Sequence, residues 1–130
     1  MFLNSETDYA IRIVACLAQH NEKLDAASIS SLTGVTLRYS LKILRRLAQG
    51  NIVRSFKGAK GGYMLSLPPD EITLYDVIEL ICGPISFSRC QGSDQACTHP
   101  QGVCYFRNTF DDVSDFMEKT FKNVTFKTED

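Results

Sequence analysis

The stretch TLRYSLKILRRLAQGNIVRSFKGAKGGY, residues 36–63, decides how this chain folds. Apolar residues recur at helical spacing in its first half, with bases largely on the other faces: Leu37, Leu41, Leu44 and Leu47, with Ile43 beside them. Thr36 is a suitable N-cap, and Gly50 stands where a left-handed residue commonly ends a helix. The sequence therefore predicts a short, basic, amphipathic helix that packs one of its faces.

Charge is unevenly distributed along the chain, although the formal net charge is only -1. Residues 26–69 contain no Asp or Glu, whereas residues 70–130 carry five bases and eleven acids. Seven of the fourteen bases lie in the middle segment: Arg38, Lys42, Arg45, Arg46, Arg54, Lys57 and Lys60. Such segregation indicates that the middle of the chain faces a polyanion, with a merely solvated basic face as the alternative.

A second short helix is predicted just before the basic one, over residues 25–34. Asp25 can cap its start, Ile29 and Leu32 are expected to face inward, and Gly34 can end it. A helix, a tight turn containing glycine and then a basic helix is the order of a helix-turn-helix, whose second helix enters the major groove of DNA.

A β-hairpin is predicted directly after the basic helix. Residues 52–56 and 63–67 alternate apolar and polar side chains around a glycine-rich tip. A basic-tipped hairpin in this position is the wing of a winged helix, and its tip bases, Lys57 and Lys60, would reach phosphate or the minor groove. The tip glycines permit either close approach to DNA or simply a tight turn: Gly58, Gly61 and Gly62.

Three further helices are predicted from apolar periodicity, over residues 6–19, 73–82 and 105–124. Thr73 and Asp76 fit a capping box. The last helix has an apolar seam suited to pairing with a second copy of the chain. The seam residues are Phe106, Phe110, Val113, Met117, Thr120 or Phe121, and Val124.

We therefore expect a mainly α fold with a small β-hairpin. Its expected parts are a winged helix-turn-helix DNA-binding domain over residues 1–83, a cysteine loop over 84–104, and a dimerisation helix with its tail over 105–130. No apolar run approaches the ~18 residues that a membrane span needs, and the start of the chain does not read as a signal peptide. A cytoplasmic location with reduced thiols is expected.

Three of the five cysteines are evenly spaced in a segment without periodicity, residues 86–103 and the position after it: Cys90, Cys97 and Cys104. Structural zinc usually takes closely paired cysteines, which are missing here, whereas wide spacing suits an iron–sulfur cluster. A cluster is favoured, and zinc, a redox switch or inert thiols stay open. Cys16 and Cys82 are expected to be core thiols.

Three segments together resemble the winged-helix transcription regulators of the family that includes IscR, NsrR and CymR. They are TDYAIRIV, LKILRRLAQGNIVRSFKGAKGGYML and SRCQGSDQACTHPQGVC, the last followed by a long helix. The resemblance covers nearly the whole chain. It implies a homodimeric DNA-binding regulator whose cysteine-bearing members hold an iron–sulfur cluster near the dimer interface.

The resemblance also implies the cluster ligands, which carry over one by one: Cys90, Cys97 and Cys104. IscR-like members supply a histidine where this chain has Arg107, so that ligand is missing. NsrR-like members use an aspartate of the first helix from the other subunit, and Asp8 stands at the matching position. His99 and Glu6 are rival fourth ligands, and the spacing of Ser5 and Asp8 also fits a simple helix cap.

The predicted DNA contacts lie on the basic helix and the wing. They are Arg38, Tyr39, Ser40 and Lys42 toward base edges, Arg45 and Arg46 toward phosphate or the core, and Lys57 and Lys60 at the wing tip. Tyr39 suits the core equally well.

The sequence thus predicts a DNA-binding regulator on a palindromic operator, with repression the expected direction. A 4Fe-4S or 2Fe-2S cluster would sense redox state, nitric oxide or iron–sulfur status. The alternatives are a cluster-free thiol- or metabolite-responsive regulator and a zinc-binding one. An enzyme or iron–sulfur electron carrier is least favoured, because no nucleotide-binding glycine motif or nucleophile–base pair is visible.

Overall fold

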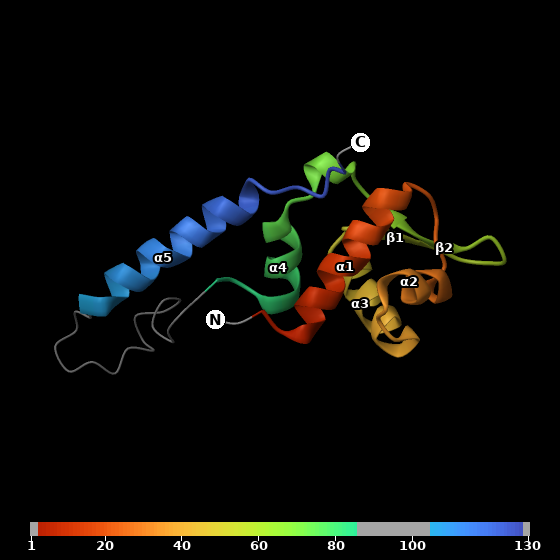
Figure 1. Cartoon of the computed structure of the whole chain (residues 1–130), viewed down its shortest axis with the longest axis horizontal. Helices are drawn as coiled ribbons and strands as arrows, with labels where there is room; N and C mark the ends of the chain where they lie inside the picture. The colour runs from red at the N-terminus through yellow and green to blue at the C-terminus, as the bar shows by residue number, and fades with distance from the viewer. Residues whose placement is uncertain (1–2, 86–104, 129–130) are drawn as a thin grey trace.

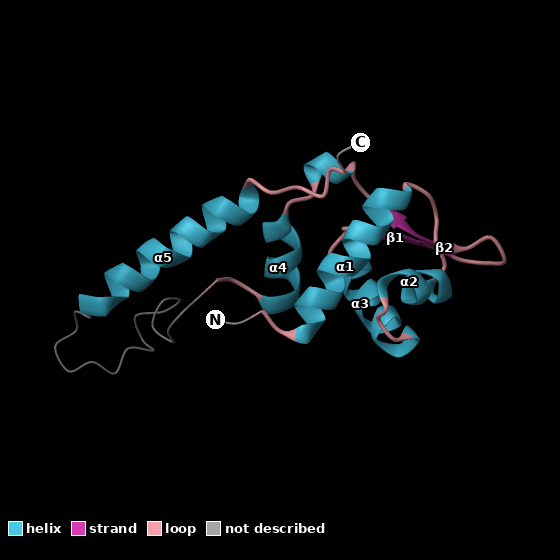
Figure 2. Cartoon of the chain, viewed as in Figure 1, coloured by secondary structure: helices cyan, strands magenta, loops and turns pink. Residues whose placement is uncertain are grey.

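The computed structural model describes residues 3–85 and 105–128, and Figure 1 shows how they are arranged. The helices are α1 (Ser5–His20), α2 (Ala26–Thr33), α3 (Leu37–Gln49), η1 (Pro69–Glu71), α4 (Leu74–Cys82) and α5 (Tyr105–Lys122), and the strands are β1 (Val53–Phe56) and β2 (Gly62–Leu65). Figure 2 shows one hairpin among helices. The described residues confirm the predicted mainly α fold with a small β-hairpin.

One core joins the first four long helices and the hairpin. Its buried residues come from every one of these elements: Ala10, Ile13, Val14, Leu17, Ile29, Ile43, Leu44, Leu47, Ile52, Val53, Ile72, Val77 and Ile81. Complete burial of each large aliphatic side chain contributes about 1.5–3 kcal/mol. Helix α1 runs through the middle of this body, and α2, α3 and α4 all pack against it.

The start of α1 differs from the predicted cap. Asn4 is the N-cap, because its Oδ1 accepts a hydrogen bond from the Thr7 backbone N–H at 2.8 Å. The carboxylate of Asp8 instead pairs with Arg12, one turn along the helix, at 3.0 Å. The prediction that Ser5 begins a cap closed by Asp8 was therefore wrong.

Helix α2 is confirmed with its predicted ends, since Asp25 caps it and Gly34 follows it at a φ of +76°. Ile29 is fully buried, but Leu32 is 54% exposed. The inward position predicted for Leu32 was wrong, because this helix of eight residues buries only Ile29.

Helix α3 begins at its predicted cap, Thr36, which accepts a hydrogen bond from the Tyr39 backbone N–H. Leu44 and Leu47 are fully buried, whereas Leu37 and Leu41 are 47% and 45% exposed. The predicted apolar stripe is therefore core in its second half only. One side of the first two turns of α3, with Leu37 and Leu41, therefore stands outside the core and is available to a partner.

Gly50 does not have the left-handed conformation that we predicted for it. Its φ is -86°, and Asn51, with φ at +62°, is the left-handed residue instead. A methyl group on Gly50 would lie 2.6 Å from Cδ2 of Leu80, so the close approach of α4 favours glycine here.

The wing is an antiparallel pair in which Val53 faces Leu65 and Phe56 faces Gly62. On the other side of β2, Leu24 forms an isolated antiparallel bridge with Tyr63. The two residues exchange backbone hydrogen bonds of 3.0 and 2.8 Å. A side chain on Gly62 would meet the carbonyl oxygen of Leu24 at 2.8 Å. The hairpin is thus anchored to the segment between α1 and α2.

The end of the chain is attached to the body through the segment before α4. The backbone N–H of Phe126 donates to the carbonyls of Pro69 and Ile72, and the N–H of Leu74 donates to that of Val124. The capping box of Thr73 and Asp76 is confirmed, with both of its hydrogen bonds present. The end of α5 is therefore fixed relative to the winged-helix domain.

Helix α5 extends away from the body and contacts α4 (Figure 1). It leaves large apolar side chains in solvent: Phe106 is 67% exposed, Val113 42% and Phe116 71%. In the described ranges, no helix is long and apolar enough to cross a membrane.

Candidate nucleic-acid interface

The exposed face of α3 presents the side chains that the sequence predicted for base contacts, with one exception. Arg38, Tyr39 and Lys42 are exposed and together line a hollow. Arg45, for which the sequence predicted a phosphate contact or a packed position, is exposed as well. The ring of Tyr39 lies 5.7 Å from that of Tyr9 at an angle of 57° and is still 44% exposed. Tyr39 is therefore a surface residue supported by α1 and not a core residue.

The exception is Ser40, which is fully buried. Its hydroxyl donates to the Val35 carbonyl at 3.4 Å, inside the turn between α2 and α3. The prediction that Ser40 reads a base edge was wrong, because its position on the helix points into the turn that positions α3.

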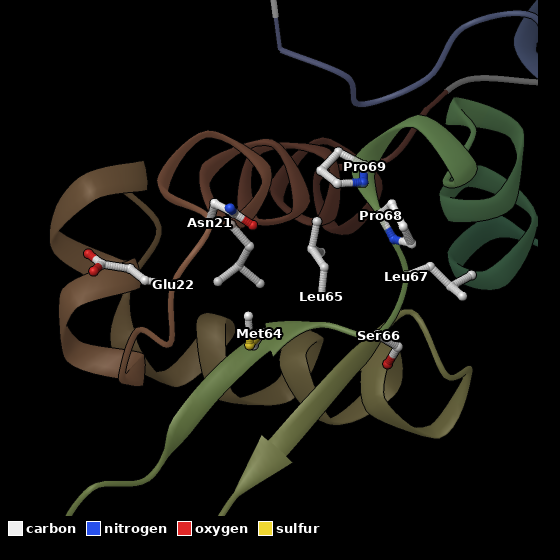
Figure 3. Close-up of a pocket in the computed structure, with 9 residues that line it drawn as sticks. Asn21, Glu22, Met64, Leu65, Ser66, Leu67, Pro68 and Pro69 are labelled. Atoms are coloured by element: carbon white, nitrogen blue, oxygen red, sulfur yellow. The ribbon is translucent and has the colours of Figure 1, made fainter.

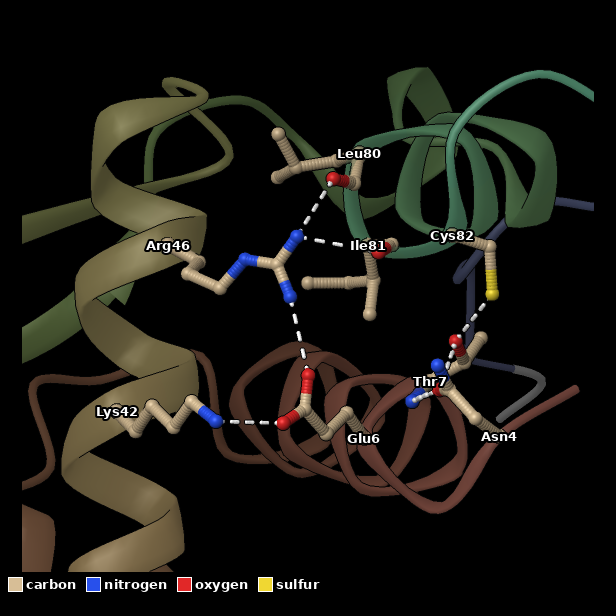
Figure 4. A network of polar contacts seen from close by, with 8 residues as sticks. All are labelled: Asn4, Glu6, Thr7, Lys42, Arg46, Leu80, Ile81 and Cys82. Carbon is tan, nitrogen blue, oxygen red and sulfur yellow. Dashed lines mark hydrogen bonds and ion pairs between the residues drawn. The ribbon is translucent and has the colours of Figure 1, made fainter.

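A carboxylate from α1 lies against the basic face of α3 (Figure 4). Glu6 accepts from Lys42 Nζ at 2.6 Å through Oε1 and from Arg46 Nη1 at 3.1 Å through Oε2. The hydrogen bond from Lys42 and its positive charge, with a smaller effect of Arg46, hold the pKa of Glu6 below its usual value. The acid-free stretch seen in the sequence is thus partly neutralised in space by a residue outside it.

Arg46 makes two further contacts within the protein, so its guanidinium is not free to contact DNA. Its Nη2 donates to the carbonyl oxygens of Leu80 and Ile81 at 3.3 and 3.1 Å, in the last turn of α4. These carbonyls have no partner within their own helix, and a basic side chain satisfies them. Of the two roles that the sequence left open for Arg46, packing within the fold is the one observed.

The wing carries exposed bases beyond its predicted tip. Lys57 and Lys60 are exposed, as is Arg54 on β1. Lys23 adds to this group, because its Nζ lies 4.9 Å from the ring centroid of Phe56. No local pattern pointed to Lys23, because it belongs to an acid-rich segment and reaches the wing only through the pairing of Leu24 with β2.

The cysteine loop lies outside the described residues, together with Cys90, Cys97, Cys104 and His99. Where the structure describes side chains, no three of His, Cys, Asp or Glu converge on a metal position. Asp8 is in the first turns of α1, half exposed and paired with Arg12.

The beginning of α1 lies beside the end of α4, where the cysteine loop begins. Thr7 Oγ1 contacts Cys82 Sγ at 2.7 Å and donates to Asn4 Oδ1 at 2.8 Å, so the Cys82 thiol is the donor to Thr7 (Figure 4). Cys82 was predicted to be a core thiol, but it is only half-buried. Cys16 is buried as predicted, and burial raises the pKa of its thiol.

A pocket of about 330 Å³ lies between the end of α1 and the segment from β2 to η1 (Figure 3). Leu17, Leu65 and Pro68 are among its apolar walls, and Glu22 is the one charged side chain among the nine described residues that line it. Its volume is at the lower end of the range for small-molecule sites. It has no pair of groups for nucleophilic or acid–base chemistry.

Comparison with known proteins identifies the family of this chain. A family model described as Rrf2, iron-dependent transcriptional regulator, matches residues 3–128. The chain belongs to the Rrf2 family. It is a transcriptional regulator, as predicted, and its relatives are not enzymes. The transcriptional regulator IscR of Pectobacterium carotovorum is 30% identical over 125 residues, which are 90% of this chain and 74% of IscR.

Solved structures of Rrf2-type regulators have the same fold. IscR of T. potens superposes with a TM-score of 0.76 at 21% identity, covering 97% of this chain and 83% of that one. CymR of B. subtilis, described as the global cysteine regulator, gives a TM-score of 0.78 at 23% identity, covering 98% and 94%. At these identities the likeness establishes the winged-helix fold.

Proposed function

We propose that this chain is a homodimeric Rrf2 regulator whose binding to operator DNA is controlled by an iron–sulfur cluster. The observation that carries the DNA part is the exposed basic face of α3, which lies on the same domain as the wing with its bases Lys57 and Lys60. A helix for the major groove and a hairpin for the backbone are the two parts of winged-helix recognition. A regulator of chromosomal DNA also implies a cytoplasmic location.

The donor set of this chain suits an iron–sulfur cluster. Three thiols, from Cys90, Cys97 and Cys104, would hold it, since thiolates are the usual ligands of such clusters. Asp8 is our candidate for the fourth ligand, because its carboxylate is half exposed at the end of α1 that touches Cys82 through Thr7. When bound, the cluster would supply one-electron redox chemistry and reactivity toward oxygen or nitric oxide. Arg12 would release Asp8 for this role.

Dimerisation is the third part of the proposal. The exposed apolar residues of α5, Phe106, Val113 and Phe116, form a face that a second copy can cover. A twofold dimer would match a palindromic operator. We propose repression as the direction of control.

Anaerobic purification tests the cofactor directly. We expect brown protein with visible absorption, and iron and sulfide counts that distinguish 4Fe-4S from 2Fe-2S. Cys97→Ala should lose iron and absorption, whereas Cys16→Ala, which removes a buried thiol of α1, should keep both. Operator affinity is then compared between loaded protein and protein stripped with a chelator. Equal affinities would contradict cluster control, and zinc in place of iron would favour the zinc-binding alternative.

The fourth ligand needs its own comparison. We expect Asp8→Ala to keep the three thiolates but to change the visible spectrum and to lose its cluster faster in air. Glu22→Ala removes an exposed acid just beyond the other end of α1 and should leave both unchanged. An unaltered spectrum and rate of loss in Asp8→Ala would exclude Asp8 as a ligand.

The pocket in Figure 3 supports a second candidate, a cluster-free regulator that responds to a small molecule. The mostly apolar pocket would take a small ligand with one cationic group facing Glu22. A thermal-shift screen of stripped protein with amine-bearing metabolites tests it. Stabilisation that disappears in Glu22→Ala, together with equal operator affinity with and without cluster, would favour this candidate over the first.

A further inference from the structure

Glu6 connects three helices that the sequence does not place together. It comes from the first turn of α1, its two carboxylate oxygens contact Lys42 and Arg46 of α3, and Arg46 continues to the last turn of α4 (Figure 4). Of these three helices, α4 is the one that leads along the chain into the cysteine segment. The position of α3 is therefore linked to that of its neighbours through one acidic side chain.

Lys42 and Arg46 have different surroundings in this network. Arg46 is 35% exposed and donates to three acceptors, so its guanidinium is committed to the fold. Lys42 is 56% exposed, lines the hollow with Arg38 and Tyr39, and forms an ion pair with Glu6. Lys42, which the sequence predicted to face base edges, is thus the member of the pair that is open to a DNA phosphate.

A phosphate at this surface meets both a base and an acid. Glu6 is 28% exposed and lies 2.6 Å from Lys42 Nζ, so a phosphate oxygen that binds Lys42 must replace the carboxylate or share the ammonium with it. The carboxylate also repels the phosphate at this short range. Binding of DNA through Lys42 therefore carries an electrostatic cost set by Glu6.

We propose that Glu6 is an internal competitor of DNA phosphate for Lys42, held in place by Arg46 and its contacts with the end of α4. This inference rests on the proposed DNA-binding function. Glu6 is a positioning residue, since it would act on DNA binding through its contact with Lys42. A shift of the first turn of α1 or of the end of α4 would move the carboxylate and change how tightly Lys42 holds DNA.

The test is a double-mutant cycle on the full chain, with a duplex selected from random-sequence DNA by the wild-type protein. Glu6→Gln keeps the shape and removes the charge. We expect it to tighten binding by about twofold to fivefold, the range that an exposed ion pair is worth. We also expect the log–log salt dependence to steepen by up to about one unit, because one more lysine releases its counterion to phosphate.

Two controls separate competition from general charge effects. In a Lys42→Met background, Glu6→Gln should gain much less affinity than in the wild-type background, because Lys42 is no longer there to be released. Glu79→Gln removes an exposed acid from α4 and should leave both affinity and salt slope unchanged. Thermal unfolding of each variant checks that the fold is intact, and a purely structural role of Glu6 would lower stability without steepening the salt slope.

The outcomes distinguish this inference from the proposed function. Wild-type protein that binds duplex DNA while Glu6→Gln binds no tighter would overturn the competition alone. An equal gain from Glu6→Gln in the Lys42→Met background would overturn it as well. Wild-type protein that binds no duplex DNA would overturn both the proposed function and this inference.

Discussion

Arg38 and Lys60 are two exposed bases at different places on the basic surface, and we expect different effects from removing each. Arg38 is in the first turn of α3, where helix-turn-helix proteins contact base edges, so Arg38→Ala should relax specificity and cost about 1 to 3 kcal/mol at one base pair. Lys60, at the wing tip, should contribute through phosphate. Lys60→Ala should weaken binding equally on all sequences and reduce the salt slope by about one unit.

The measurement is binding to the selected duplex and to a scrambled one over a series of salt concentrations. Arg45→Ala removes a third exposed base, which like Arg38 lies on α3, for comparison. If Arg38→Ala and Lys60→Ala lose the same affinity on scrambled DNA, the division between base contact and phosphate contact is wrong.

At the scale of single residues, the sequence predicted those features that depend on residues close by in the chain. The caps at Thr36 and Asp25 follow from local patterns of hydrogen-bonding side chains, and both were confirmed. The burial of Ser40 depends on how the turn before α3 is packed. The pairing of Glu6 with Lys42 joins residues 36 positions apart, which no local pattern encodes.

Cys16 provides a prediction about reactivity. Burial raises the pKa of its thiol, so at mildly alkaline pH less thiolate is present in the folded protein than in the unfolded chain. Alkylation of Cys16 by iodoacetamide should therefore be slow in native protein and fast in urea, as followed by mass spectrometry of the peptide. Equal rates in the two states would show that α1 exposes this thiol.

The wing is the element whose shape depends most on single glycines. A methyl group on Gly61 would collide with the backbone carbonyl of Phe56. We expect Gly61→Ala to open the tip and to weaken DNA binding by the loss of wing contacts, while thermal unfolding of the helical body changes little. Ala59→Ser changes an exposed residue of the same tip and should bind like wild type. Equal DNA affinity of the two variants would contradict a role for the tip.

Elements were predicted better than their packing. The order of helices and the hairpin follow from periodicity and glycine positions, and the described residues confirm them. The pairing of Leu24 with Tyr63 was not predicted, because one isolated residue carries no strand pattern. The glycines at 61 and 62 have intramolecular reasons in this structure, since side chains there would meet Phe56 and Leu24. Approach to DNA stays a prediction.

At the scale of the whole molecule, α5 has two kinds of apolar surface. The side toward α4 is partly covered, with Lys122 Nζ lying 4.8 Å from the Tyr75 ring centroid. The remaining face is in solvent, and its most exposed large apolar side chain is Phe116, at 71%. The sequence predicted a seam that omits Phe116, because a regular heptad pattern does not show which side of a helix its own domain covers.

This exposed face makes the oligomeric state sensitive to one added charge. Phe116→Asp would bury a carboxylate in the proposed dimer interface, so we expect the dimer to dissociate and affinity for a palindromic duplex to fall steeply. Asn108→Asp adds the same charge to an exposed residue on another face of α5 and should leave both unchanged. Analytical ultracentrifugation measures the mass of each variant. A Phe116→Asp dimer as stable as wild type would show that two copies associate through another surface, and the spacing of their α3 helices on DNA would then be set by that surface instead.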